Sequence, residues 1–139
     1  MKFKFFFLSM SFITILFSCT NDDDNQVFVN ESWLLGSWDL INVKVNNVTD
    51  DASSCHILNF KNNGTYYRTY EHGNWKLNNN TIELDAMRDN DDRHLEIIRL
   101  TPNTLMVRME LTVNQYRRNF DEHNENEVLT ISETYKRNN

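Results

Sequence analysis

The feature that most restricts the fold is an alternation of apolar and polar residues at period two, from Trp38 to near the end of the chain. Short clusters of Asn, Gly, Asp and Pro interrupt it. This pattern indicates antiparallel strands with one buried and one solvated face, since a helix would repeat at 3.6 residues. We therefore predict an all-β domain of eight strands, which begin near Trp38, His56, Thr65, Gly73, Thr81, His94, Thr104 and Val128.

The clearest hairpin covers residues 56–70, with its turn at residues 61–65. A type I turn followed by Gly64 in the left-handed conformation closes a three-residue loop and determines the register. The facing pairs on the apolar side are Phe60 with Tyr66, Leu58 with Arg68, and His56 with Tyr70. A slip of one residue would mix the polar and apolar faces, so the pattern supports this register.

A second hairpin is expected around a two-residue turn at Asn79 and Asn80, since Asn tolerates positive φ. Its register predicts three facing pairs, which are Leu77 with Ile82, Trp75 with Leu84, and Lys76 with Glu83. The longest regular alternation covers residues 105–113. Sequential short strands with hairpin-length connections suggest a small antiparallel up-and-down barrel, and a sandwich of similar length is the competing architecture.

The amino terminus has the features of a lipoprotein signal peptide. Lys2 and Lys4 precede a mostly apolar run over residues 5–17, which is too short to span a bilayer. The sequence Leu16-Phe17-Ser18-Cys19 resembles the bacterial lipobox. This resemblance implies that Cys19 is acylated, with chains such as palmitate, and becomes the new amino terminus after cleavage. We therefore expect a signal peptide over residues 1–18, a lipidated tether over 19–30 and a folded domain over 31–139.

Residues 20–26 contain three consecutive Asp residues and no apolar residue, which is typical of a solvated tether. An acidic run at this position also resembles the surface-export signal of lipoproteins in the Bacteroidota. We expect a lipid-anchored protein of the outer membrane, displayed on the cell surface. Anchoring on the periplasmic side is the alternative.

Composition argues against several function classes. Without the signal peptide the chain carries 20 acidic and 12 basic residues, a balance that repels nucleic acid. Cys55 is then the single remaining cysteine, so no internal disulfide is expected. The four histidines lack metal-ligand spacing, and no nucleotide or hydrolase motif is present. We predict a monomer without metal, cofactor or enzymatic activity.

Several segments together resemble the lipocalin-like domain of small Bacteroidota lipoproteins. They are Leu34-Leu35-Gly36-Ser37-Trp38-Asp39, residues 58–66, residues 73–77 and Tyr135-Lys136-Arg137, and the resemblance spans about residues 31–137. It implies a calycin-type barrel in which Gly36 and Trp38 form the opening motif. It also implies that Trp38 closes one end, with Arg137 or Lys136 packed across its ring.

The inner face of the first hairpin is the predicted ligand site, with the residues His56, Leu58, Phe60, Tyr66, Arg68, Tyr70 and Trp75. An interior Arg offers bidentate recognition of a carboxylate or phosphate. Alternatively, Arg68 is solvated at an open mouth or pairs with an interior acid. The sequence thus favours a module that binds a small apolar or amphipathic ligand. The alternative is a filled barrel that presents residues 89–93 and 119–126 to a protein or glycan partner.

Overall fold

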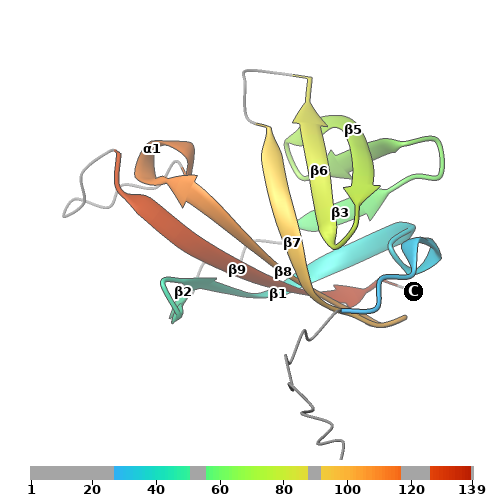
Figure 1. Cartoon of the computed structure of the whole chain (residues 1–139), viewed down its shortest axis with the longest axis horizontal. Helices are drawn as coiled ribbons and strands as arrows, with labels where there is room; N and C mark the ends of the chain where they lie inside the picture. Colours follow the sequence, from blue (N-terminus) through green and yellow to red (C-terminus); the bar gives the residue numbers. More distant parts are fainter. Residues whose placement is uncertain (1–26, 51–55, 88–91, 117–125, 139) are drawn as a thin grey trace, which may run out of the picture.

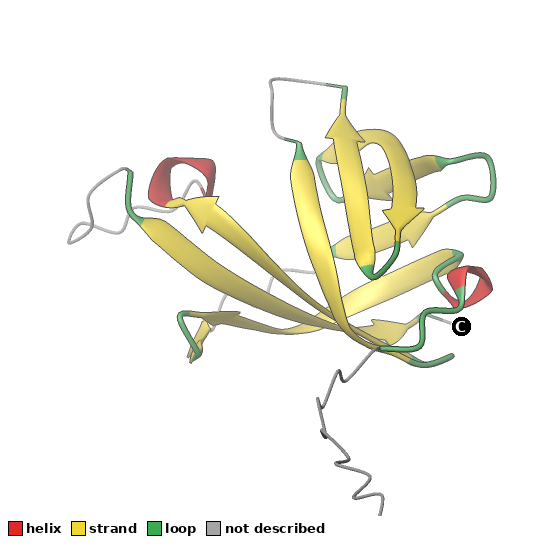
Figure 2. Cartoon of the chain, viewed as in Figure 1, coloured by secondary structure: helices red, strands yellow, loops and turns green. Residues whose placement is uncertain are grey.

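Antiparallel strands dominate the computed structural model, which describes residues 27–50, 56–87, 92–116 and 126–138 (Figure 2). In the described residues the helical segments are short, a 3-10 turn η1 (Glu31–Trp33) and the helix α1 (Val113–Tyr116). Neither is long and apolar enough to cross a membrane. The strands are β1 (Gly36–Val45), β2 (Val48–Asp50), β3 (Ile57–Phe60), β4 (Thr65–Arg68), β5 (Glu71–Asn78), β6 (Thr81–Ala86), β7 (Arg93–Leu100), β8 (Thr104–Thr112) and β9 (Val128–Arg137).

Eight of these strands close into a barrel. Each strand from β3 to β8 pairs with the next strand along the chain, and β1 pairs with both β3 and β9 (Figure 1). The predicted all-β up-and-down barrel is therefore confirmed, and the sandwich is excluded. β2 is a ninth, additional strand that pairs with the end of β1. It was not predicted, because its three residues are too few for alternation to be recognised.

The first hairpin has the predicted register at two of its three pairs. Phe60 faces Tyr66 and Leu58 faces Arg68, but the expected pairing of His56 with Tyr70 is wrong. β4 ends at Arg68, which pairs directly with Glu71 of β5. Thr69 takes a positive φ of 34°, and the side chain of Tyr70 is 94% exposed. These two residues form a tight turn that carries Tyr70 away from the interior.

The second hairpin agrees with the prediction throughout. Trp75 faces Leu84, and Lys76 faces Glu83 with 2.7 Å between the ammonium and the carboxylate. Asn79 has a φ of 55°, as the turn requires. On β8 the buried residues alternate as expected, and the inward faces of all eight barrel strands meet in one core.

Trp38 closes the end of the barrel beside η1. It is fully buried, and its indole Nε1 donates to the carbonyl of Leu34 at 2.8 Å. The guanidinium carbon of Arg137 lies 4.0 Å from the centre of the Trp38 ring. Arg137 also donates to the carbonyls of Trp33 and Leu35. The residue across the ring is thus Arg137 and not Lys136, whose side chain points outward and is exposed.

Gly36 is the position where this arrangement needs a residue without a side chain. Its φ is +111°, a conformation that residues with a Cβ rarely adopt. A Cβ built there would come within 2.8 Å of a guanidinium nitrogen of Arg137. The absence of a side chain at Gly36 therefore leaves room for the guanidinium of Arg137, which also lies over the ring of Trp38.

Candidate functional site

Four charged side chains occupy positions that the strand alternation places on the inner face of the barrel. Arg68 is on β4, Glu71 on β5, Arg93 on β7 and Glu133 on β9, each in phase with buried apolar neighbours. Glu133 is only 4% exposed. Charges at such positions are costly unless they are paired, so their partners define the chemistry of the interior.

Each interior carboxylate binds one arginine and one tyrosine. A terminal nitrogen of Arg68 lies 2.5 Å from Oε1 of Glu133, and the hydroxyl of Tyr135 donates to Oε2 of the same group at 2.7 Å. The hydroxyl of Tyr66 donates to Oε1 of Glu71. A nitrogen of Arg93 lies 3.5 Å from the other oxygen of Glu71. Two parallel clusters of Arg, Glu and Tyr thus neutralise the interior charge.

The protonation states follow from this environment. Burial, and then the bonded carboxylate of Glu71, raise the pKa of Tyr66 far above its usual value. Burial also raises the pKa of Tyr135, with Glu133 adding to the effect. Burial is the largest single influence on Arg68 and opposes its charge, but Glu133, Tyr135 and Glu71 together outweigh it and raise the pKa. The interior therefore holds charged Arg68 beside neutral tyrosines.

Two of the interior arginines have donor capacity left. One terminal nitrogen of Arg68 is buried without a hydrogen-bond partner among the described residues. The contact of Arg93 with Glu71 is long, with 3.5 Å between a guanidinium nitrogen and a carboxylate oxygen. A guanidinium carries five N–H donors, and buried donors in native proteins are nearly always satisfied by protein, water or ligand.

The barrel wall opens between β7 and β8. Their ladder ends at the pair Glu96 and Arg108, after a bulge near Ile98. Both strands continue past this point, β7 paired with β6 and β8 paired with β9, so they diverge (Figure 1). We call this divergence the β7–β8 fork.

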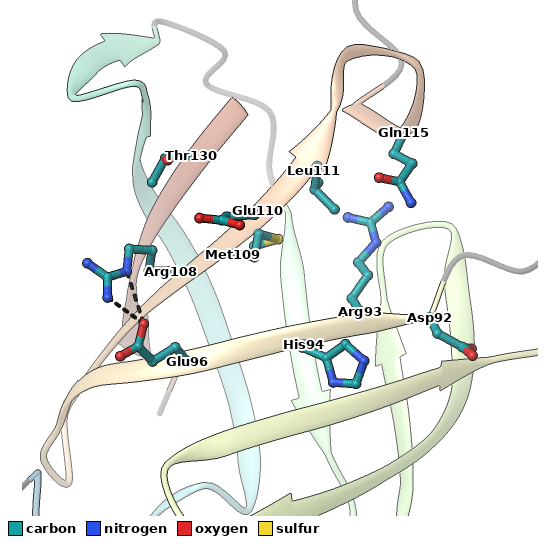
Figure 3. Close-up of a pocket in the computed structure, with 10 residues that line it drawn as sticks. All are labelled: Asp92, Arg93, His94, Glu96, Arg108, Met109, Glu110, Leu111, Gln115 and Thr130. Carbon is teal, nitrogen blue, oxygen red and sulfur yellow. Dashed lines mark hydrogen bonds and ion pairs between the residues drawn. The ribbon is translucent and has the colours of Figure 1, made fainter. Parts of the chain in front are cut away.

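A cavity of about 610 Å³ occupies the fork. Its lining residues are Asp92, Arg93, His94, Glu96, Arg108, Met109, Glu110, Leu111, Gln115 and Thr130 (Figure 3). Figure 3 shows Arg93 reaching from β7 toward Leu111 of β8 and Gln115 of α1. This volume is within the range of small-molecule sites. The lining combines the apolar side chains of Met109 and Leu111 with charged and polar side chains.

The comparison with protein families agrees with this architecture. The model of the lipocalin-like domain matches residues 34–107, which is more than half of the chain. The chain belongs to the lipocalin-like domain family. Such barrels are typically ligand-binding proteins and not enzymes, which supports a binding role at a coarse level. The comparison with characterised proteins gave no match.

The lipocalin-like barrel distributes the predicted ligand residues over three environments. Leu58, Phe60, Tyr66 and Trp75 are buried in the core, and Arg68 is paired with Glu133. His56 precedes β3, with Nδ1 3.1 Å from the hydroxyl of Thr69, and Tyr70 is exposed. None of these seven residues lines the fork cavity. Their role in ligand binding stays a prediction.

Sequence reasoning missed Glu71, Arg93 and Glu133, although the sequence carries a signal for Arg93 and for Glu133. Glu133 stands between Ile131 and Tyr135 in the inward phase of its strand, and Arg93 stands two residues before Leu95. A charged residue in the buried phase of a strand indicates an interior partner.

In the described ranges, no three His, Cys, Asp or Glu side chains gather as metal ligands would. Cys19 and Cys55 lie outside the described residues.

The raised pKa values of Tyr66 and Tyr135 predict a loss of stability in alkali. An unfolded tyrosine ionises near pH 10, so above that pH the unfolded state binds fewer protons than the native state. The free energy of unfolding is then expected to fall by about 1.4 kcal/mol per pH unit for each of the two tyrosines. The slope approaches this value about one pH unit above the pKa of the unfolded tyrosine, so urea unfolding between pH 9 and 12 measures it. Tyr135→Phe should roughly halve it, and an unchanged slope would contradict the assignment.

Proposed function

We propose that this lipocalin-like protein is a membrane-anchored binding module that holds a small apolar or amphipathic ligand. The observation that carries the proposal is the fork cavity, which is lined by the apolar side chains of Met109 and Leu111 and also by Arg93. Two apolar side chains beside charged and polar groups can receive the two parts of an amphipathic molecule, its hydrocarbon and its polar head. Membership of a family of binding barrels supports the same conclusion.

Native mass spectrometry of the full chain tests ligand binding directly. We expect a small molecule to remain bound to the purified protein and to be identifiable after extraction. Gln115→Trp should fill the cavity from its rim and abolish this binding. Gln115→Ala is the matched control, because it loses the same contacts with Thr112 but leaves the cavity open. Ligand retention in both variants would place the molecule elsewhere.

The alternative function is a filled barrel that displays loops to a protein or glycan partner. The observation that favours it is the dense filling of the closed half, where Trp38, Phe60, Tyr66 and Tyr135 are all buried. Most of the residues expected to form the displayed loops, 89–93 and 119–126, lie outside the described residues. Absence of any bound molecule in the wild-type protein would favour this alternative.

Anchoring is proposed to occur through acylation of Cys19, with outer-membrane attachment and display on the cell surface. Support comes from the lipobox and the acidic tether in residues 1–26, which lie outside the described residues. Two acyl chains hold a protein on a membrane stably, where one chain would be marginal.

Labelling with a radioactive fatty acid tests the anchor. The wild-type chain should incorporate label and Cys19→Ala should not. Cys55→Ala is the matched control, because it removes the chain's other cysteine and should leave labelling intact. Surface display further predicts cleavage by protease on intact cells, reduced when Asp22, Asp23 and Asp24 are replaced by Ala. Equal labelling of the wild-type chain, Cys19→Ala and Cys55→Ala would refute the anchor at Cys19.

A further inference from the structure

The ligand chemistry of the fork cavity depends on which cation is available there. Arg108 is half exposed and donates twice to Glu96, at 3.0 and 2.6 Å, on the outer face of the barrel. Arg68 is committed to Glu133. Arg93 differs from both, because its side chain is only 16% exposed and its partner Glu71 stands 3.5 Å away. Arg93 is therefore the cation on the cavity wall that is mostly enclosed and still has unused donors.

The rest of the lining limits the charge and the shape of an anion that Arg93 can bind. Asp92, Glu96 and Glu110 line the same cavity, so a multiply charged anion such as phosphate would be repelled. A single carboxylate matches the planar fork of a guanidinium and carries one negative charge. Met109 and Leu111 supply the apolar surface beside it.

We propose that the fork cavity binds a small carboxylate amphiphile, with its carboxylate on Arg93 and its hydrocarbon chain against Met109 and Leu111. This inference rests on the proposed function and specifies its ligand class. Glu71 is the internal competitor, since its carboxylate is the ion-pair partner of Arg93 in the absence of ligand. When the ligand carboxylate replaces it, Glu71 retains the hydrogen bond from Tyr66. The position of the cavity indicates access through the barrel wall, between the diverging strands (Figure 3).

Calorimetric titration of the full chain with octanoate and with 1-octanol tests this assignment. The two probes share a hydrocarbon chain, and only octanoate carries the carboxylate. All variants keep residues 5–17, so any binding to that apolar segment is common to every titration. We expect octanoate to bind more tightly than octanol. Arg93→Gln should weaken octanoate at least about tenfold and leave octanol unchanged.

Two further variants separate a specific contact from general charge or folding effects. Arg99→Gln removes the same charge from the same strand at an exposed position that does not line the cavity, so it should leave octanoate binding unchanged. Glu71→Gln should tighten octanoate binding, because it removes the competitor for Arg93. A gain in affinity cannot arise from misfolding. Glu71→Gln therefore tests the contact between octanoate and Arg93 even if Arg93→Gln does not fold.

The outcomes distinguish this inference from the proposed function. Equal loss of octanoate affinity in Arg93→Gln and Arg99→Gln, or weaker binding in Glu71→Gln, would overturn the assignment to Arg93. If octanol binds and octanoate binds no more tightly, the carboxylate class is wrong while the cavity remains a binding site. If neither probe binds the wild-type chain, both the inference and the proposed small-ligand function fail.

Discussion

Trp38→Ala is expected to lower the free energy of unfolding by about 3 to 5 kcal/mol, the usual cost of truncating a large buried aromatic residue. Trp38 is fully buried at the closed end of the barrel. The truncation also removes the indole donor to the Leu34 carbonyl and the ring beneath Arg137. The lost contacts join η1, β1 and the end of β9, so the closed end is expected to loosen as a unit.

Urea unfolding followed by circular dichroism measures this loss. Trp33→Ala is the matched control, because Trp33 also lies at the closed end but is only partly buried. Its truncation should cost clearly less, since the cost of a cavity depends on how completely the side chain is enclosed. Similar losses in the two variants, or a loss near zero for Trp38→Ala, would show that the indole does not hold this end together.

Glu133→Gln is the second change with a large expected effect, a destabilisation of about 3 to 5 kcal/mol. The substitution keeps the shape of the side chain and its capacity to accept from Tyr135, but it removes the negative charge. Arg68 would then remain in the interior, with 13% of its side chain exposed, facing no neutralising carboxylate across the 2.5 Å contact. The expected loss reflects an uncompensated buried charge and not a cavity.

The double variant Arg68→Met with Glu133→Gln tests this cause. Replacing a whole buried ion pair by neutral side chains of similar size is often close to neutral, whereas breaking it from one side is costly. We therefore expect the double variant to be more stable than Glu133→Gln alone in the same urea titration. The single variant Arg68→Met completes the comparison. If the loss of stability in the double variant equals the sum of the losses in Arg68→Met and Glu133→Gln, the interaction of Arg68 with Glu133 is not the source of the destabilisation.

Local pairing was predictable from the chain because its causes are local. In the hairpins, the pairs of Phe60 with Tyr66 and Trp75 with Leu84 follow from alternation and from the turns at Gly64 and Asn79. Tyr70 was misplaced because the turn at Thr69 contains neither Gly nor Asn, so nothing in the sequence marks it as a turn. Alternation therefore determines which residues can share a face, and turn chemistry determines where each strand ends.

The all-β class, the strand order and most of the inward-facing residues were predictable from the amino-acid sequence, because period-two alternation and short turns act over a few residues. The tertiary structure alone decided which interior charges meet. Arg68 and Glu133 are 65 residues apart, and only closure of β1 on β9 brings their strands around one interior. The fork likewise depends on where the β7–β8 ladder ends, which packing of the whole barrel decides. The candidate site is thus a product of closure, since its cation, its competitor and its apolar wall come from three separate strands.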